Sequence, residues 1–191
     1  MPSAALRRAL NEPGDPVLQP LPPPVAELLD ALDAPPRLAA HLRAVHDAAF
    51  RLTARLAADL PDLPFDRHAV LFGAATHDIG KVLHTAELSG PGHRHEAAGR
   101  DLLIRYGVPM HLARFAATHG SWESEDAGLD DLLVSLADKI WKGARVESLE
   151  ERVARFLGGP PWEAFLALDD LVQDLAGGAD ARLAFQAAYP V

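Results

Sequence analysis

The sequence predicts an all-α fold, and two observations lead to this prediction. Apolar residues recur at spacings of three and four along most of the 191-residue chain, which is the pattern of amphipathic helices. Few windows alternate between apolar and polar residues, and the β-branched residues that favour strands are sparse. The length suits one domain with a substantial core.

Proline dominates the end of the first 24 residues, which close with EPGDPVLQPLPPP. Proline fixes φ and lacks a backbone N–H, so such a stretch does not continue a helix. We therefore expect an extended, polyproline-like arm over residues 1–24. The segment VAELLDALDA follows and predicts a short helix at the start of a domain that covers residues 25–157.

Five further helices are predicted from apolar periodicity and from the proline and glycine residues that end it. The expected ranges are 36–59, 66–78, 95–106, 110–119 and 129–144. The segments LHTAELSGPGHR and GSWESEDAG are expected to be loops. Two or three more helices are expected over residues 158–191, joined by GGPP and GG and packed on the same domain.

Several histidines and aspartates fall on the apolar faces of these predicted helices. His41 lies three residues after Leu38 and four before Val45, so it points inward. One buried histidine is commonly a satisfied core residue, but two buried carboxylates are costly without a cation. A shared metal would satisfy the whole group. The inward residues are His41, His77, Asp78, His95, His119 and Asp138.

The donor types limit the metal and its chemistry. The chain contains no cysteine, so imidazole and carboxylate ligands remain, and these suit Mn, Fe, Co, Ni, Zn or Mg with positions open to water. His77 and Asp78 are adjacent, and neighbouring side chains on a helix diverge by about 100°. They can reach one ion only where the helix ends, and we expect Gly80 to supply that end.

The order His41, His77-Asp78, Asp138 resembles the H…HD…D signature of the HD-domain metal-dependent phosphohydrolase superfamily. The segments HLRAV, HDIGK and SLADKI are similar to the corresponding motifs, and the resemblance covers about residues 37–145. It implies an all-α bundle that binds divalent metal and hydrolyses phosphoester or phosphoanhydride bonds. A minority of the superfamily are oxygenases.

The resemblance also implies a role for each motif residue. His41, His77, Asp78 and Asp138 would hold a first ion. HEAAG, with His95, and ATHG, with His119, resemble the two additional histidine motifs of dinuclear members, in which Asp78 would bridge two ions. We therefore expect one or two divalent ions.

Two departures separate this chain from the family's cyclic-dinucleotide phosphodiesterases. Many of those have a histidine pair where His119 is followed by Gly120, and they carry a GYP-type extension that this chain lacks. The pattern is closer to small bacterial HD hydrolases that act on nucleotides.

Catalysis and substrate binding are assigned to a few charged residues. Asp78 and Lys81 are the predicted catalytic residues, and Lys81 directly follows the HD pair. Predicted substrate contacts come from Lys81, Arg94, Arg100 and Lys142. For each cation the competing interpretation is a solvated surface residue, which near a helix C-terminus is also favoured by the helix dipole.

Bulk properties limit the partners. The net charge of −9 argues against a large nucleic-acid or anionic-membrane surface. No signal-peptide pattern and no apolar run near the ~20 residues of a membrane span is present, so a cytoplasmic location is expected. The expected partner is a small phosphorylated molecule, nucleotide-like, and oligomerisation stays open. Alternative functions are a diiron oxygenase on the same fold and a non-catalytic metal-binding sensory domain.

Overall fold

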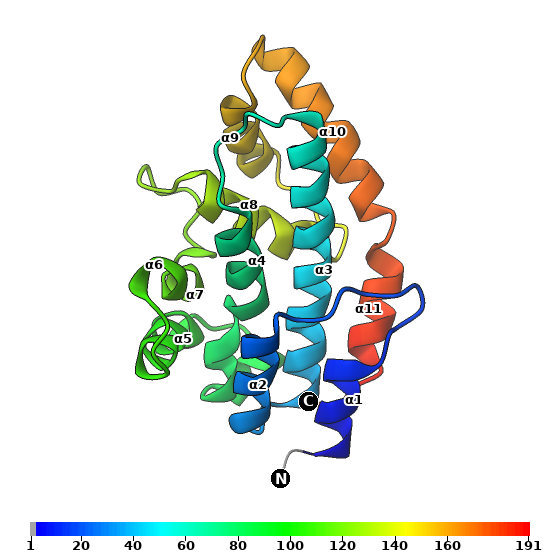
Figure 1. The fold of residues 1–191 in the computed structure, drawn as a ribbon, viewed down its shortest axis with the longest axis vertical. Helices are drawn as coiled ribbons and strands as arrows, with labels where there is room; N and C mark the ends of the chain where they lie inside the picture. Colours follow the sequence, from blue (N-terminus) through cyan, green and yellow to red (C-terminus); the bar gives the residue numbers. More distant parts are fainter. Residues whose placement is uncertain (1–2) are drawn as a thin grey trace.

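A computed structural model describes residues 3–191 (Figure 1). Within that range the regular elements are helical and no strand occurs, which confirms the predicted all-α fold. The α-helices are α1 (Ala4–Asn11), α2 (Pro23–Ala31), α3 (Pro36–Asp59), α4 (Arg67–Thr76), α5 (Arg94–Arg105), α6 (Met110–Ala113), α7 (Phe115–Thr118), α8 (Leu129–Ile140), α9 (Glu147–Leu157), α10 (Pro161–Ala176) and α11 (Ala179–Ala187). Two 3₁₀ helices follow α4, namely η1 (Ile79–Val82) and η2 (Thr85–Leu88).

Helix α3 is the centre of the fold and runs along most of the molecule (Figure 1). Proline at its first position fits a helix start, because its φ is already helical and its missing N–H would have had no partner there. Helices α1, α4, α8, α10 and α11 all pack against α3. Leu38, Val45 and Leu52 are fully buried as a result, and His41 lies near the start of this central helix.

Two apolar cores lie along α3. The first joins its C-terminal part to α4, α8, α9 and α10, and the second joins its N-terminal part to α1, α2, η1 and α5. On α4, Ala74 belongs to the first core and Ala75 to the second. The segment that continues from α4 with His77 and Asp78 therefore enters the molecule where the two cores meet.

The extended arm predicted for residues 1–24 is wrong over Ala4–Asn11, which form helix α1. The Ser3 hydroxyl accepts a hydrogen bond from the Leu6 N–H at 3.0 Å and caps the helix. Leu6 and Ala9 are fully buried, so α1 gains its stability by packing on α3. The free energy gained by burying this apolar face stabilises the helix even though a proline-rich stretch follows it.

The rest of that predicted arm agrees better with the structure. Residues 12–22 contain no helix, and residues 1–2 lie outside the described range. Helix α2 begins within the proline run, with proline in its first turn. The division of the chain at residues 24/25 and 157/158 stays a prediction, although α10 and α11 pack against α3, and α9 against α8.

The helix predicted for residues 66–78 ends earlier, at Thr76, and a 3₁₀ helix replaces its last turn. Gly80 therefore does not end α4. It permits close packing instead, because a Cβ atom at this position would collide with the backbone of His95 and Gly99 on α5. The close approach of η1 and α5 brings Asp78 next to His95.

Two other predicted helices also differ from the structure. The segment 110–119 divides into α6 and α7, and the segment 129–144 ends as helix at Ile140. Arg114 lies between α6 and α7, and its guanidinium makes two hydrogen bonds to Asp131 of α8 at 3.2 and 3.3 Å. These bonds fix the position of α7, which leads directly to His119.

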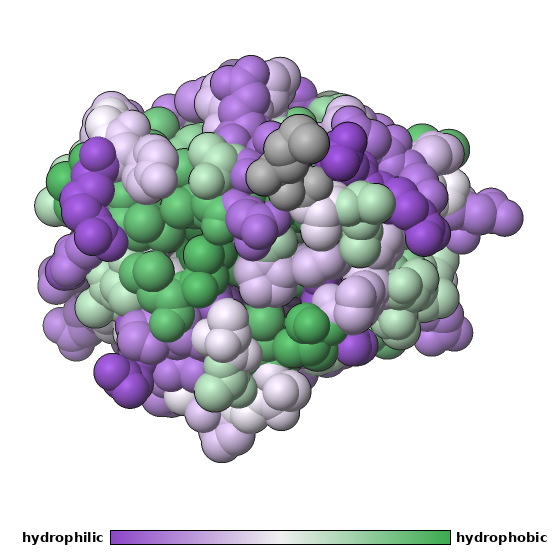
Figure 2. Space-filling model, turned by 90° about the horizontal axis from the view of Figure 1, so that it is seen from below, coloured by the Kyte–Doolittle hydropathy of each residue, from purple (hydrophilic) through white to green (hydrophobic). Residues whose placement is uncertain are grey.

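The end of the molecule formed by α1 and α2 has a mixed surface, with apolar groups gathered on one part of it (Figure 2). A cavity of about 300 Å³ between α2 and the end of α5 is lined mainly by apolar side chains, including Leu28, Phe72 and Val108. None of its lining residues is a predicted ligand. No helix in residues 3–191 combines the length and apolar character needed to cross a bilayer.

Candidate metal centre

The six side chains predicted as ligands lie together where the two cores meet. They come from α3, the α4–η1 junction, α5, the end of α7 and α8. Each side chain is at most 13% exposed. The group consists of His41, His77, Asp78, His95, His119 and Asp138.

The break between α4 and η1 lets two adjacent residues face the same point. His77 still has helical dihedral angles, whereas Asp78 has φ −102° and ψ 9°. This change turns the Asp78 carboxylate back towards the His77 ring, and their Oδ2 and Nε2 atoms are 3.6 Å apart. A helix end is therefore present, but it comes at Thr76, two residues before the predicted end at Asp78.

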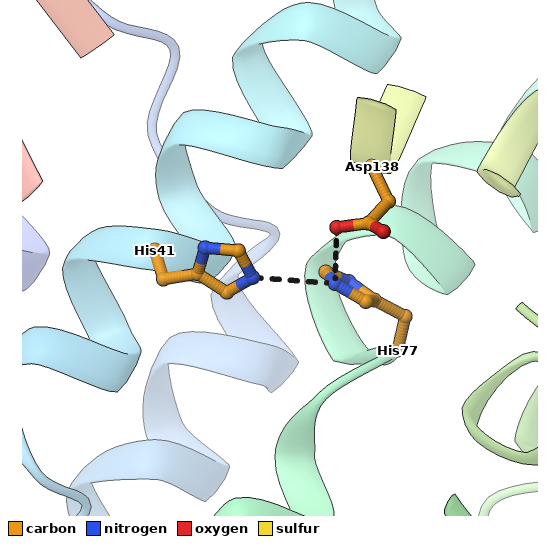
Figure 3. A group of neighbouring side chains, drawn as sticks. All are labelled: His41, His77 and Asp138. Carbon is orange, nitrogen blue, oxygen red and sulfur yellow. Dashed lines mark hydrogen bonds and ion pairs between the residues drawn. The ribbon is translucent and has the colours of Figure 1, made fainter. Parts of the chain in front are cut away.

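One group of ligand atoms joins three helices (Figure 3). His77 Nε2 lies 3.3 Å from His41 Nε2 and 3.4 Å from Asp138 Oδ1. Asp78 Oδ2 adjoins the same group, 3.1 Å from His41 Nε2. The sequence placed these four residues around a first ion, and the structure brings their donor atoms together.

A second group surrounds the other oxygen of the same carboxylate. Asp78 Oδ1 lies 3.0 Å from His95 Nε2 and 3.6 Å from His119 Nε2. The ligand atoms within each group lie within 4.8 Å of one another. Asp78 therefore offers one oxygen to each group.

Hydrogen bonds on the outer ring nitrogens determine the tautomers. A carbonyl or carboxylate oxygen only accepts, so the Nδ1 atom opposite it carries the proton. This applies to His77 and Ala74 O at 2.9 Å, and to His119 and Ala116 O at 3.2 Å. In the neutral rings the Nε2 atoms then carry lone pairs, and these atoms face the centre of the site.

The geometry fits bound cations better than direct hydrogen bonds. Within residues 3–191 the buried His95 Nε2 has no hydrogen-bond partner, although Asp78 Oδ1 is 3.0 Å away. A lone pair facing a carboxylate oxygen at that distance is repulsive unless a cation lies between them. Two ligands of one ion, each about 2.1 Å from it and roughly at right or tetrahedral angles, are about 3.0–3.4 Å apart. Most of the separations given above lie in or near this range.

The electrostatics of the group also favour a cation. Burial alone would raise the pKa of Asp78 and of Asp138, but the neighbouring histidines, His77 foremost, together with Lys139 beside Asp138, outweigh it, and both pKa values are lowered. Burial lowers the pKa of His119 to about 4. Burial would lower the pKa of His77 as well, but the Asp78 and Asp138 carboxylates and the Ala74 carbonyl together outweigh it and raise that pKa. Two ionised carboxylates thus remain in a buried site, where a divalent ion would balance them.

The predicted substrate residues lie at different distances from this group. Lys81 Nζ is 2.5 Å from Asp78 Oδ2, and its side chain is 19% exposed. Arg94 and Lys142 are exposed, and Arg100 pairs with its neighbour Asp101 at 2.8 Å. In the described part of the chain these last three make no hydrogen bond or ion pair with the six ligands, and their assignment to substrate stays a prediction.

Three residues that were not among the predicted site residues support the candidate ligands. Lys139 Nζ lies 2.8 Å from Asp138 Oδ2. The Trp141 ring packs edge-on against His41, with ring centroids 4.9 Å apart. Glu87 Oε2 lies 2.6 Å from His95 Nδ1. Lys139 and Trp141 follow Asp138 closely, so their positions gave a signal, whereas Glu87 lies in a predicted loop where no periodicity indicated its direction.

A family model described as HD domain matches residues 38–142. The match covers more than half of the chain and contains all six candidate ligands. No curated protein and no solved structure matches the chain significantly.

Proposed function

The chain belongs to the HD domain family, and from this membership and the geometry of the centre we propose that it is a metal-dependent phosphohydrolase. It would use water to cleave a phosphoester or phosphoanhydride bond of a small nucleotide-like substrate. The observation that carries the proposal is the position of Asp78, whose two oxygens face separate sets of imidazole nitrogens. We further propose that the centre is dinuclear, with His95 and His119 as ligands of the second ion.

The side chains in the two groups are sufficient in number and type to hold two divalent ions. His41, His77 and Asp138 would hold one ion, His95 and His119 the other, and Asp78 would join both. The chemistry that bound divalent ions supply is a water nucleophile at neutral pH and neutralisation of phosphoryl charge. The surrounding apolar cores exclude bulk water from the buried side of the site, and this strengthens every charge interaction there.

Lys81 is the residue best placed to bind the substrate. Its ammonium group already contacts the bridging carboxylate, and its side chain reaches partly into solvent. The flexible lysine stem allows the ammonium group to turn from Asp78 to a phosphoryl oxygen that enters the site. Arg94, Arg100 and Lys142 would then contact more remote parts of the substrate.

Chelation provides the direct test of this activity. The full chain, stripped of metal, should release no phosphate from nucleotides or simple phosphate esters. Addition of Mn, Co, Ni, Fe, Zn or Mg should restore hydrolysis, because the water nucleophile depends on the ion. Phosphate release and metal content are measured on the same samples. A fully loaded protein that hydrolyses no phosphate, but oxidises a substrate when iron and oxygen are present, would contradict the proposal and favour the oxygenase.

The role of Lys81 leads to a second expectation. Lys81→Gln should lower kcat/KM by about 10²-fold, comparable to the loss of one charge-stabilising donor, while metal content stays unchanged. Lys139→Gln is the matched control, because Lys139 also pairs with a ligand carboxylate. Steady-state kinetics and metal analysis are compared for the two variants. Equal losses in both variants would mean that Lys81 only balances the charge of Asp78.

A further inference from the structure

Glu87 connects the loop after the HD pair to a candidate ligand. Its side chain, which comes from η2, is only 9% exposed. Oε2 lies 2.6 Å from His95 Nδ1 and accepts from the His95 backbone N–H at 3.1 Å. Oε1 accepts from the Arg94 N–H at 3.2 Å. One carboxylate thus binds both the start of α5 and the imidazole that this helix carries.

Gly92 makes room for this carboxylate. A Cβ atom at position 92 would lie 2.5 Å from Glu87 Oε1, which is closer than real Cβ contacts allow. A larger residue at this point would force the Glu87 carboxylate to shift from its position under the loop between η2 and α5. Contacts with the start of α5 hold the Glu87 side chain in one conformation.

The three contacts have one consequence for His95. The carboxylate accepts the Nδ1 proton, so the neutral ring has its lone pair on Nε2, and Nε2 is the atom directed at Asp78 Oδ1. The backbone bonds to Oε1 and Oε2 prevent the carboxylate from moving with the ring. His95 is thereby fixed both in tautomer and in ring orientation.

We propose that Glu87 is a positioning residue that holds His95 in the geometry and tautomer needed to bind the second divalent ion. This inference rests on the proposed metal centre. A carboxylate on the outer nitrogen of a ligating histidine makes the imidazole a stronger donor, and loss of such a partner costs about 10- to 100-fold in metal affinity. Glu87 touches neither Asp78 nor the first group of ligands in the contacts described, so the effect should be confined to the second ion.

The test compares Glu87→Gln and Glu87→Ala with Glu96→Gln in the full chain. Glu96 is a matched control because it also binds a histidine, with Oε1 2.9 Å from Nδ1 of His93, a residue that is 87% exposed and not a ligand. Metal-free samples are titrated with Co²⁺, and binding is followed by calorimetry and by the visible absorption of the bound ion. Circular dichroism checks that the helix content is unchanged, and the Gln variant keeps one acceptor oxygen for the first turn of α5.

We expect the wild type to bind two Co²⁺ ions with different affinities. Glu87→Gln should weaken only the second by about 10-fold, and Glu87→Ala by about 100-fold with a changed absorption band. Glu96→Gln should match the wild type. Unchanged second-ion affinity in folded Glu87→Ala would overturn the role of Glu87 and leave the proposed function intact. If the wild type binds only one ion, there is no second site and the role proposed for Glu87 is wrong. Hydrolysis of phosphate by that one-ion protein would still support the proposed phosphohydrolase activity.

Discussion

Asp78→Asn should abolish hydrolysis and remove both ions. The substitution keeps the size of the side chain but removes the charge that faces both sets of imidazoles. Loss of a residue that only hydrogen-bonds a ligating histidine already costs about 10- to 100-fold in metal affinity, and Asp78 is predicted as a direct ligand of both ions. We therefore expect turnover to fall by on the order of 10³-fold or more, which corresponds to about 4 kcal/mol of transition-state stabilisation.

Three measurements on the same samples check this expectation. Elemental analysis should find two ions per chain in the wild type and fewer than one in Asp78→Asn. Each ion at 100 times its dissociation constant should stabilise the wild type by about 2.7 kcal/mol, and added metal should have little effect on the variant. Phosphate release should follow metal content.

Asp59→Asn is the control for loss of one negative charge. Asp59 is exposed and pairs with Arg55 at 3.6 Å, away from the site. The control should keep wild-type metal content and turnover. An Asp78→Asn protein that still binds two ions and hydrolyses phosphate at the wild-type rate would contradict the mechanism, because the bridging charge would then be dispensable.

The sequence could predict that the six candidate ligands lie together because they combine two signals. Each imidazole or carboxylate lies on an apolar helical face, and their order along the chain resembles a known signature. The helix end at His77-Asp78 was expected from the chemistry, since adjacent side chains cannot reach one ion within a regular helix. The cause of that end was mispredicted, because Gly80 serves close packing on α5, a long-range contact that periodicity does not encode.

Other features depend on contacts that one sequence does not reveal. Helix α1 has a serine cap and an apolar face, but the prolines that follow it suggested an extended chain. Glu87 binds His95 across a loop, so its direction depends on how that loop closes. Charged residues are rarely buried, yet Arg43 is only 2% exposed, because its acceptors come from the distant N-terminal segment.

Arg43→Met should destabilise the protein strongly without emptying the metal centre. Arg43 lies on α3, two residues after His41, and its guanidinium donates to backbone carbonyls of the N-terminal segment. The acceptors are the carbonyl oxygens of Ala9, Glu12, Leu18 and Gln19. These bonds attach α1 and the extended residues after it to the central helix. Methionine would fill part of the volume but leave the carbonyls without their donor.

The expected loss can be estimated from the hydrogen bonds. A bond to a charged group contributes about 1.5–3 kcal/mol, but some of the freed carbonyls can reach water when the N-terminal segment moves. We therefore expect the free energy of unfolding to fall by about 3 kcal/mol, which lowers Tm by about 6–12 °C for a chain of this size. Urea denaturation measures the change. Proteolysis should also become faster within residues 12–22, which Arg43 no longer holds.

Arg55→Met separates this effect from the loss of any arginine on α3. Arg55 lies on the same helix, is 52% exposed and makes surface pairs with Asp59 and Asp174 at 3.6 and 3.4 Å. Exposed pairs contribute about 0–1 kcal/mol, so this variant should unfold close to the wild type. The side chain of His41 points to the metal centre while that of Arg43 points to the N-terminal segment, so Arg43→Met should keep its ions. Equal free energies of unfolding for the two variants would contradict this prediction, because the hydrogen bonds from Arg43 to the N-terminal segment would then add no net stability.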